Sequence, residues 1–141
     1  MLVPKKVKHR KWQSARRKPA RMLGGLETRG ATLSFGSFGL KTLEYERITS
    51  NQLESARKAM SRAIKKTGKI WIRVFPDRPF TAKAPEMPMG KGKGDPQGYC
   101  FEVYPGRILF EIDGVPDDVA MECLRHAGDK LPVRTKIVKR D

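Results

Sequence analysis

The stretch MGKGKG at residues 89–94 carries residue types suited to contact with phosphates. Its glycines allow close approach of the backbone and expose N–H groups, while Lys91 and Lys93 add mobile positive charges. The phosphate loop of a nucleotide hydrolase needs the pattern G-x-x-x-x-G-K-[ST] at the start of a helix. Here Lys93 is followed by Gly-Asp-Pro, which begins no helix. The stretch therefore favours contact with a sugar–phosphate backbone over nucleotide hydrolysis.

The reactive groups that an enzyme must bring together are scarce in this chain. Its two histidines are far apart, with His9 near the N-terminus and His126 on an expected helix. The sequence contains no Gly-x-Ser-x-Gly elbow and no cluster of Cys or His at metal-binding spacing. Cys100 and Cys123 are isolated, which favours reduced, half-buried thiols over a disulfide. We therefore expect no enzymatic activity, no catalytic residue, no cofactor and no metal.

Positive charge is the dominant feature of the composition. The 141 residues include 30 Lys and Arg against 15 Asp and Glu, a net charge of +15. Residues 1–24 hold nine basic residues and no acid, whereas 25–141 hold 21 basic and 15 acidic residues, a net of +6. The nine candidate RNA-binding residues of this arm are Lys5, Lys6, Lys8, Arg10, Lys11, Arg16, Arg17, Lys18 and Arg21.

Such an excess of charge predicts a polyanionic partner, with nucleic acid ahead of an anionic membrane surface. A membrane is disfavoured because no apolar run approaches the roughly 18 residues that span a bilayer, and the N-terminus lacks the apolar core of a secretion signal. RNA is favoured over DNA because the chain shows no helix-turn-helix, zinc finger or basic zipper. A cationic RNA chaperone or nucleic-acid-compacting protein without a fixed site remains the alternative.

The positions of apolar residues predict an arm followed by one domain. We expect residues 1–30 to form an extended basic arm and 31–141 a single α+β RNA-binding domain. Two short strands are expected within 31–48 around a turn at Gly36–Ser37, from apolar alternation at Ala31, Leu33 and Phe35.

A helix is predicted over residues 50–67. Thr49 and Gln52 fit a capping box, and Gly68 stands at the expected C-terminal cap. The apolar stripe consists of Leu53, Ala56, Met60, Ala63 and Ile64. The opposite face, which is either solvated or lies on phosphates, carries the candidate RNA-binding residues Lys58, Arg62, Lys65 and Lys66.

The second half of the chain predicts strands, a loop and another helix. A strand at 69–75 should place Trp71 and Phe75 in the core rather than on bases, and Pro76 and Pro79 should open an irregular, flexible segment, 76–98. Then follow a hairpin over 99–114 turning at Pro105–Gly106, a helix from Pro116, and a basic strand over 132–140. Together these predict a two-layer α+β sandwich, a mostly antiparallel sheet with two helices on one side.

Several stretches together resemble one known family. They are MLVPKKVKHRK, ITSNQLESARKAMSRAIKKTGKIWIRVFPDRPFT, MGKGKGDPQG, PGRILFEIDGV and KLPVRTKIVKR. In this order they are similar to the bacterial-type large-subunit ribosomal protein sixteen family, over roughly residues 1–11 and 31–141. Segment 12–30 aligns only loosely, so its role is inferred from charge alone.

The resemblance implies a structural protein of the large ribosomal subunit, cytoplasmic or organellar, incorporated late in assembly as a monomer. It implies binding to large-subunit ribosomal RNA and neighbouring ribosomal proteins, with an RNA-embedded N-terminus at residues 5–11. It also implies a loop tip that points toward the peptidyl-transferase region and the elbow of aminoacyl-tRNA. The matching tRNA-proximal residues are Met89, Gly90, Lys91, Gly92, Lys93 and Gly94. Pro88 replaces the usual arginine of the family, which is hydroxylated in some members, so that modification cannot occur at this position.

Overall fold

The computed structural model describes residues 1–13 and 25–141. In order along the chain, the helices and strands are β1 (Phe38–Thr42), β2 (Glu46–Thr49), α1 (Ser50–Ile64), β3 (Lys69–Ile72), β4 (Arg78–Ala82), β5 (Asp95–Val103), β6 (Ile108–Asp113), α2 (Asp117–Asp129) and β7 (Thr135–Lys139).

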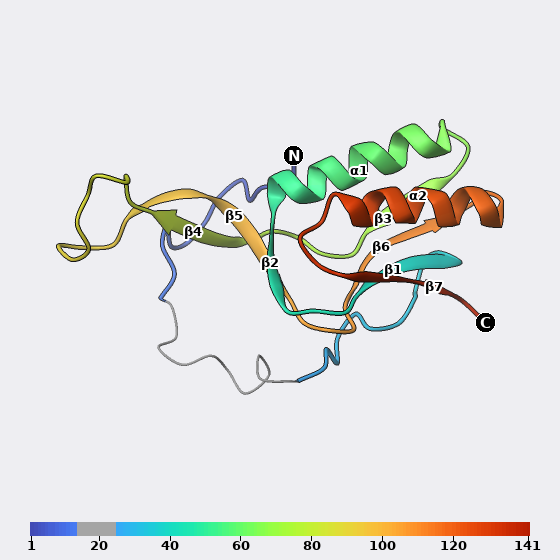
Figure 1. Cartoon of the computed structure of the whole chain (residues 1–141), viewed down its shortest axis with the longest axis horizontal. Helices are drawn as coiled ribbons and strands as arrows, with labels where there is room; N and C mark the ends of the chain where they lie inside the picture. The colour runs from blue at the N-terminus through green and yellow to red at the C-terminus, as the bar shows by residue number, and fades with distance from the viewer. Residues whose placement is uncertain (14–24) are drawn as a thin grey trace.

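Two antiparallel sheets and a pair of helices make up the fold. The four-stranded sheet has the order β3-β6-β1-β7, and the three-stranded sheet has the order β2-β5-β4. Figure 1 shows α1 and α2 side by side on the same side of the strands. The predicted two-layer α+β sandwich is confirmed, although its strands belong to two sheets rather than one.

Helix α1 begins at the predicted capping box. The Thr49 hydroxyl accepts from the Gln52 N–H at 3.3 Å, and the Gln52 side chain accepts from the Thr49 N–H at 2.9 Å. The helix ends at Ile64, three residues earlier than predicted, because Thr67 turns back to donate to the Ile64 carbonyl. Lys65, with a φ of 47°, is therefore the C-cap, and the prediction of Gly68 for this role is wrong.

The core lies between the helices and the strands. The predicted stripe of α1 is confirmed, since Leu53, Ala56 and Met60 are fully buried. From α2, the residues Ala120, Cys123, Leu124 and Ala127 are buried against them. Cys100 and Cys123 are free thiols that are buried rather than half-buried, and burial raises the pKa of Cys123 to about 11.

Tertiary pairing overturns three local predictions. Residues 31–37 form no strand, and the first strand begins at Phe38. The turn at Pro105–Gly106 exists, but β5 pairs with β2 and β4 while β6 pairs with β1 and β3, so 99–114 is a corner between sheets and not a hairpin. Segment 76–98 is not irregular throughout, because strands β4 and β5 occupy both of its ends.

The two prolines of that segment fit its strands. Pro79 pairs with Tyr99 on β4, an edge strand, where a missing N–H is tolerated. Only residues 83–94, called here the Gly/Lys loop, join β4 to β5 without regular structure. In Figure 1 this loop projects at the end of the β4–β5 ribbon, away from the helices.

Candidate nucleic-acid interface

The first 13 residues form neither helix nor strand and run beside the β4–β5 ribbon (Figure 1). Their beginning is held near the start of α1, where the Ser50 hydroxyl donates to the Met1 Sδ at 3.6 Å. Met1 and Val3 line a recess there together with Phe80 and Tyr99 of the three-stranded sheet. The beginning of the arm is thus attached to the domain by apolar contact, which leaves its basic side chains turned to solvent. These exposed residues are Lys5, Lys6, Lys8 and Arg10, with Lys11 half-buried.

The arm and the Gly/Lys loop are joined to each other. The Lys11 ammonium donates to the Lys93 carbonyl at 3.2 Å, and the Lys93 ammonium donates in return to the Trp12 carbonyl. The Arg78 guanidinium lies 5.6 Å from the centre of the Trp12 ring, a cation–π contact that fixes the same part of the arm to β4. Two cationic segments that are some 80 positions apart in sequence therefore lie side by side.

The loop has an open tip with a left-handed backbone. Gly90, Lys91 and Gly92 have φ values of 100°, 58° and 104°. No atom lies within 4 Å of a Cβ placed at either glycine, so space does not require glycine there but backbone conformation does. Lys83 ties the base of the loop together by donating to the carbonyls of Pro88, at 3.3 Å, and Gly90.

This geometry leaves the loop's exposed groups free for a partner. The loop surrounds a hollow of about 550 Å³, whose lining includes Lys83, Lys91 and Lys93 together with glycine backbone. Met89, at the tip, is 93% exposed. Among the residues that the structure describes, Lys91 enters no hydrogen bond or ion pair, and its ammonium group is available to a phosphate.

Not all predicted RNA-binding residues lie together. Lys58, Arg62, Lys65 and Lys66 are exposed, as predicted for a basic face. However, the last two lie beyond the C-terminal end of α1, whereas the arm meets its N-terminal end, about 22 Å away for a helix of 15 residues. The predictions for Arg16, Arg17, Lys18 and Arg21 fall outside the described residues.

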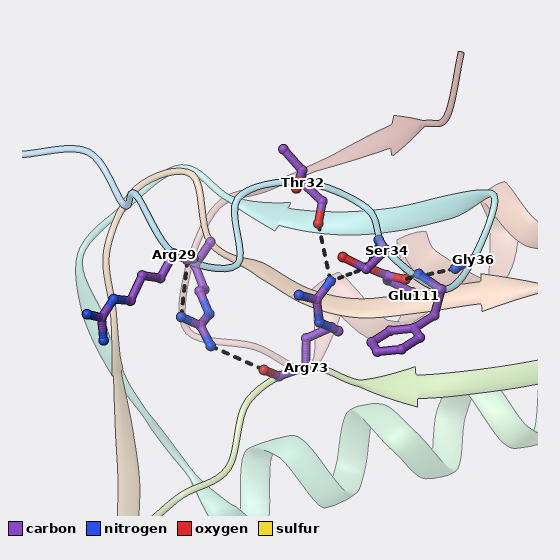
Figure 2. Close-up of polar contacts among 8 residues, drawn as sticks. Arg29, Thr32, Ser34, Gly36, Arg73 and Glu111 are labelled. Carbon is purple, nitrogen blue, oxygen red and sulfur yellow. Dashed lines mark hydrogen bonds and ion pairs between the residues drawn. The ribbon is translucent and has the colours of Figure 1, made fainter.

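A second arrangement, not predicted from the sequence, holds residues 25–37, called here the crossing segment, against the four-stranded sheet. Its carbonyls accept from the side chains of Arg107, at Arg29 and 3.1 Å, and Arg73, at Thr32 and 3.2 Å. Figure 2 shows both arginines reaching from the sheet to this segment. The Ile108 N–H also donates to the Gly30 carbonyl at 2.8 Å.

Glu111 is the centre of this arrangement. The side chain, on β6, is fully buried and accepts from three consecutive backbone N–H groups of the crossing segment (Figure 2). The donors are Ser34 at 2.9 Å, Phe35 at 2.6 Å and Gly36 at 2.8 Å. Arg73 adds an ion pair to the same carboxylate.

Burial by itself raises the pKa of Glu111, but the N–H groups of Ser34, Gly36 and Phe35 and the Arg73 guanidinium lower it below its ordinary value. The carboxylate therefore stays charged and fixes the backbone that follows the arm. One signal in the sequence pointed to it: an acid inside the otherwise apolar run ILFEI.

The same contacts position an aromatic pair on the sheet. Alternation places Trp71 on the face opposite Ile70 and Ile72, which pack on the core. The rings of Trp71 and Phe35 stack with centroids 6.0 Å apart and an interplanar angle of 17°. The prediction of core packing is thus wrong for Trp71, which is half-buried outside the apolar cluster, and for Phe75, which is 43% exposed.

Searches for other kinds of site give little within residues 1–13 and 25–141. That part of the chain contains no group of three or more His, Cys, Asp or Glu side chains placed to hold a metal ion. It also contains no helix with the length and apolar character needed to cross a bilayer. His126 contacts Glu122 at 3.5 Å, one turn away on α2.

Comparison with known proteins gives a consistent match over almost the whole chain. The family model described as Ribosomal protein L16p/L10e matches residues 4–138. Large ribosomal subunit protein uL16 of Methylorubrum extorquens (strain PA1) is 51% identical over 140 residues, covering 99% of this chain and 98% of that protein. The protein of the same name from Methylorubrum populi shows the same identity and coverage.

Proposed function

The chain belongs to the ribosomal protein L16p/L10e family, and we propose that its arm binds large-subunit ribosomal RNA while its Gly/Lys loop contacts transfer RNA. Membership in the family makes the protein a structural constituent of the large ribosomal subunit and not an enzyme. It works in the cytoplasmic ribosome together with ribosomal RNA and other ribosomal proteins. The proposal concerns which surfaces of this chain touch which RNA.

The junction of arm and loop is the observation that carries the proposal. Lys11, Trp12 and Lys93 connect the two segments, so that their positive charges form one surface. The arm contributes five basic residues and no acid over positions 1–13. Surfaces of this kind bind RNA through its phosphates and its shape, because lysine and arginine neutralise phosphates without reading bases.

The arm is the proposed anchor on ribosomal RNA. Its exposed lysines and arginines neutralise phosphates, and release of counterions offsets the entropy that the arm loses on ordering. The masked part of the arm adds Arg16, Arg17, Lys18 and Arg21 to the proposed contacts by charge alone. The basic face of α1 is a second and separate contact, since it lies at the other end of that helix.

The loop is the proposed contact with transfer RNA near the aminoacyl-tRNA site and the peptidyl-transferase region. Its tip combines an exposed lysine with two glycines whose N–H groups are unshielded by side chains. Lys83 holds the base of the loop while the tip stays open. A tip of this kind can follow a phosphate backbone closely, and its contact is made after the subunit has assembled.

The test separates the loop's two lysines. Lys91→Ala removes an exposed charge and leaves the arm junction intact, whereas Lys93→Ala also removes the bond to the Trp12 carbonyl. We expect particles carrying Lys91→Ala to sediment as complete large subunits but to bind aminoacyl-tRNA more weakly. Lys93→Ala should reduce both subunit assembly and aminoacyl-tRNA binding.

The matched control is Lys58→Ala, which removes one exposed charge from α1. It should leave aminoacyl-tRNA binding unchanged. A Lys91→Ala protein that impairs assembly and not tRNA binding would contradict the proposed division of labour between arm and loop.

A further inference from the structure

Phe35 is an exposed aromatic residue in an unusually constrained setting. It is 53% exposed, and it lies in the crossing segment between the arm and β1. Its backbone N–H donates to Glu111 at 2.6 Å, and the N–H groups on either side donate to the same carboxylate. The position of its Cα is therefore fixed by three hydrogen bonds to one buried charge.

The ring of Phe35 is fixed as well. It stacks on Trp71 at 6.0 Å, and the Arg73 guanidinium lies 5.3 Å from its centroid. Arg73 is itself held by Glu111 and by the Thr32 carbonyl. An exposed apolar side chain that is held by its neighbours loses little conformational freedom when a partner binds, which favours binding.

The surroundings of the ring are cationic at the surface. The Lys69 ammonium lies 5.4 Å from the Trp71 ring centroid, and Lys69 is exposed. Two acids are nearby, but both are engaged: Glu111 as described, and Asp113, which accepts from the Ser37 hydroxyl at 3.0 Å and the Gly114 N–H at 2.8 Å. Lys69 remains as the mobile charge beside the stacked rings.

We propose that the exposed surface of the Phe35 ring is a stacking site for one unpaired nucleobase of ribosomal RNA, with Lys69 contacting an adjacent phosphate. This inference rests on the proposed function and adds a contact of a different chemistry, because the arm and loop neutralise phosphates whereas Phe35 engages a base face. Aromatic side chains stack on bases with little sequence preference. The site lies on the face of the four-stranded sheet opposite the helices.

An RNA base fits this surface better than a protein side chain. An aromatic ring flanked by a lysine matches the alternation of base and phosphate along a single strand. The charge of the whole chain, +15, also favours a polyanion over another protein surface. A protein partner is an outcome that the experiment below distinguishes.

The experiment compares the wild type with Phe35→Leu, which keeps an apolar side chain, and Phe35→Trp, which keeps a stacking surface. Each is added to large subunits stripped of this protein by salt, and to protein-free large-subunit RNA. We expect Phe35→Leu to raise the dissociation constant about 5- to 150-fold, the value of one stacked base, and Phe35→Trp to bind as the wild type. Dimethyl sulfate should show at least one base that the wild type and Phe35→Trp protect and Phe35→Leu does not.

Lys69→Ala provides a second, independent variant because its side chain is exposed and its loss does not threaten the fold. It should flatten the dependence of log K on log salt by about 0.7 to 0.9, the value of one phosphate, whereas Phe35→Leu should leave that slope unchanged. Equal thermal unfolding of all variants shows that the fold is intact.

Three results would overturn the inference. Phe35→Leu may bind as tightly as the wild type, with every base protected alike. It may instead bind stripped subunits weakly while no base changes reactivity and binding to free RNA is unaffected, which would identify a protein partner. A wild-type protein that binds neither stripped subunits nor RNA would overturn the proposed function together with the stacking site.

Discussion

Glu111 shows how one residue links the sheet to the chain that precedes it. Its carboxylate receives the N–H groups of Ser34, Phe35 and Gly36, which carry partial positive charge in a concave arrangement suited to an anion. A buried charge is tolerated only when it is paired and hydrogen-bonded, and Arg73 completes the pairing. The crossing segment and its exposed Phe35 therefore depend on this one acid.

We expect Glu111→Gln to lower the free energy of unfolding by about 3–5 kcal/mol at neutral pH, the cost of removing one partner from a buried ion pair. Because the pKa of Glu111 is lowered in the folded state, its stabilising contribution is complete above the unfolded value of about 4.3. That contribution is lost as the pH falls through the lower folded pKa. Urea unfolding at a series of pH values measures the difference between the two proteins.

The difference should stay constant from neutral pH down to about pH 5 and shrink as the pH falls below about 4. Glu122→Gln is the matched control, since its side chain is 66% exposed, and it should change stability by less than about 0.5 kcal/mol. A difference between wild type and Glu111→Gln that does not vary with pH would show that the carboxylate charge contributes nothing.

At the scale of elements, local signals determined where helices begin better than how strands pair. The capping box of α1 lies within four residues and is read from the sequence directly. The end of α1 depends on Thr67, and the partners of β5 and β6 depend on strands far away in the chain. Pro105–Gly106 is a turn in either case, so the turn alone did not reveal that the two strands enter different sheets.

Thr49→Ala should lower the free energy of unfolding by about 0.5–2 kcal/mol, because it leaves the Gln52 N–H at the start of α1 without its acceptor. Thermal unfolding should shift downward by about 2–4 °C per kcal/mol. Ser55→Ala, an exposed change inside the same helix, is the control and should change stability by less than about 0.5 kcal/mol. Equal melting temperatures for wild type and Thr49→Ala would contradict a stabilising role of the cap.

At the scale of the whole molecule, positive charge is gathered by tertiary contacts. The arm, the Gly/Lys loop and β4 meet through Lys11, Trp12, Arg78 and Lys93. The basic face of α1 extends to the other end of that helix, so the protein presents two separate cationic surfaces. A rigid domain with surfaces on different sides suits a protein that is surrounded by RNA at a fixed site.

Replacing Lys5, Lys6, Arg10 and Lys11 with alanine should flatten the dependence of log K for ribosomal RNA on log salt by about 3, since each neutralised phosphate contributes about 0.7 to 0.9. Binding measured between low and moderate salt gives the slope. The equal-charge variant replaces Lys58, Arg62, Lys65 and Lys66. An unchanged slope for the arm variant, or an equally large change for the α1 variant, would count against the arm as the main anchor.

Sedimentation of the wild type in cell extract distinguishes a fixed site from non-specific binding. Comigration with large subunits should persist when the salt is raised, because a fixed site also relies on shape and on contacts such as the proposed base stack. A cationic chaperone would instead spread over the gradient and return to free protein, since its binding rests on counterion release alone.

The sequence by itself determined the charge of the arm, the exposed lysines of the loop, the start of α1 and the family. These follow from composition, from contacts between near neighbours, or from long stretches of matching residues. Only the tertiary structure decided that β5 and β6 separate, that Glu111 fixes the crossing segment, and that arm and loop meet. Each of these joins residues tens of positions apart, and such pairings are chosen by burial and hydrogen bonding across the whole fold, which no local pattern records.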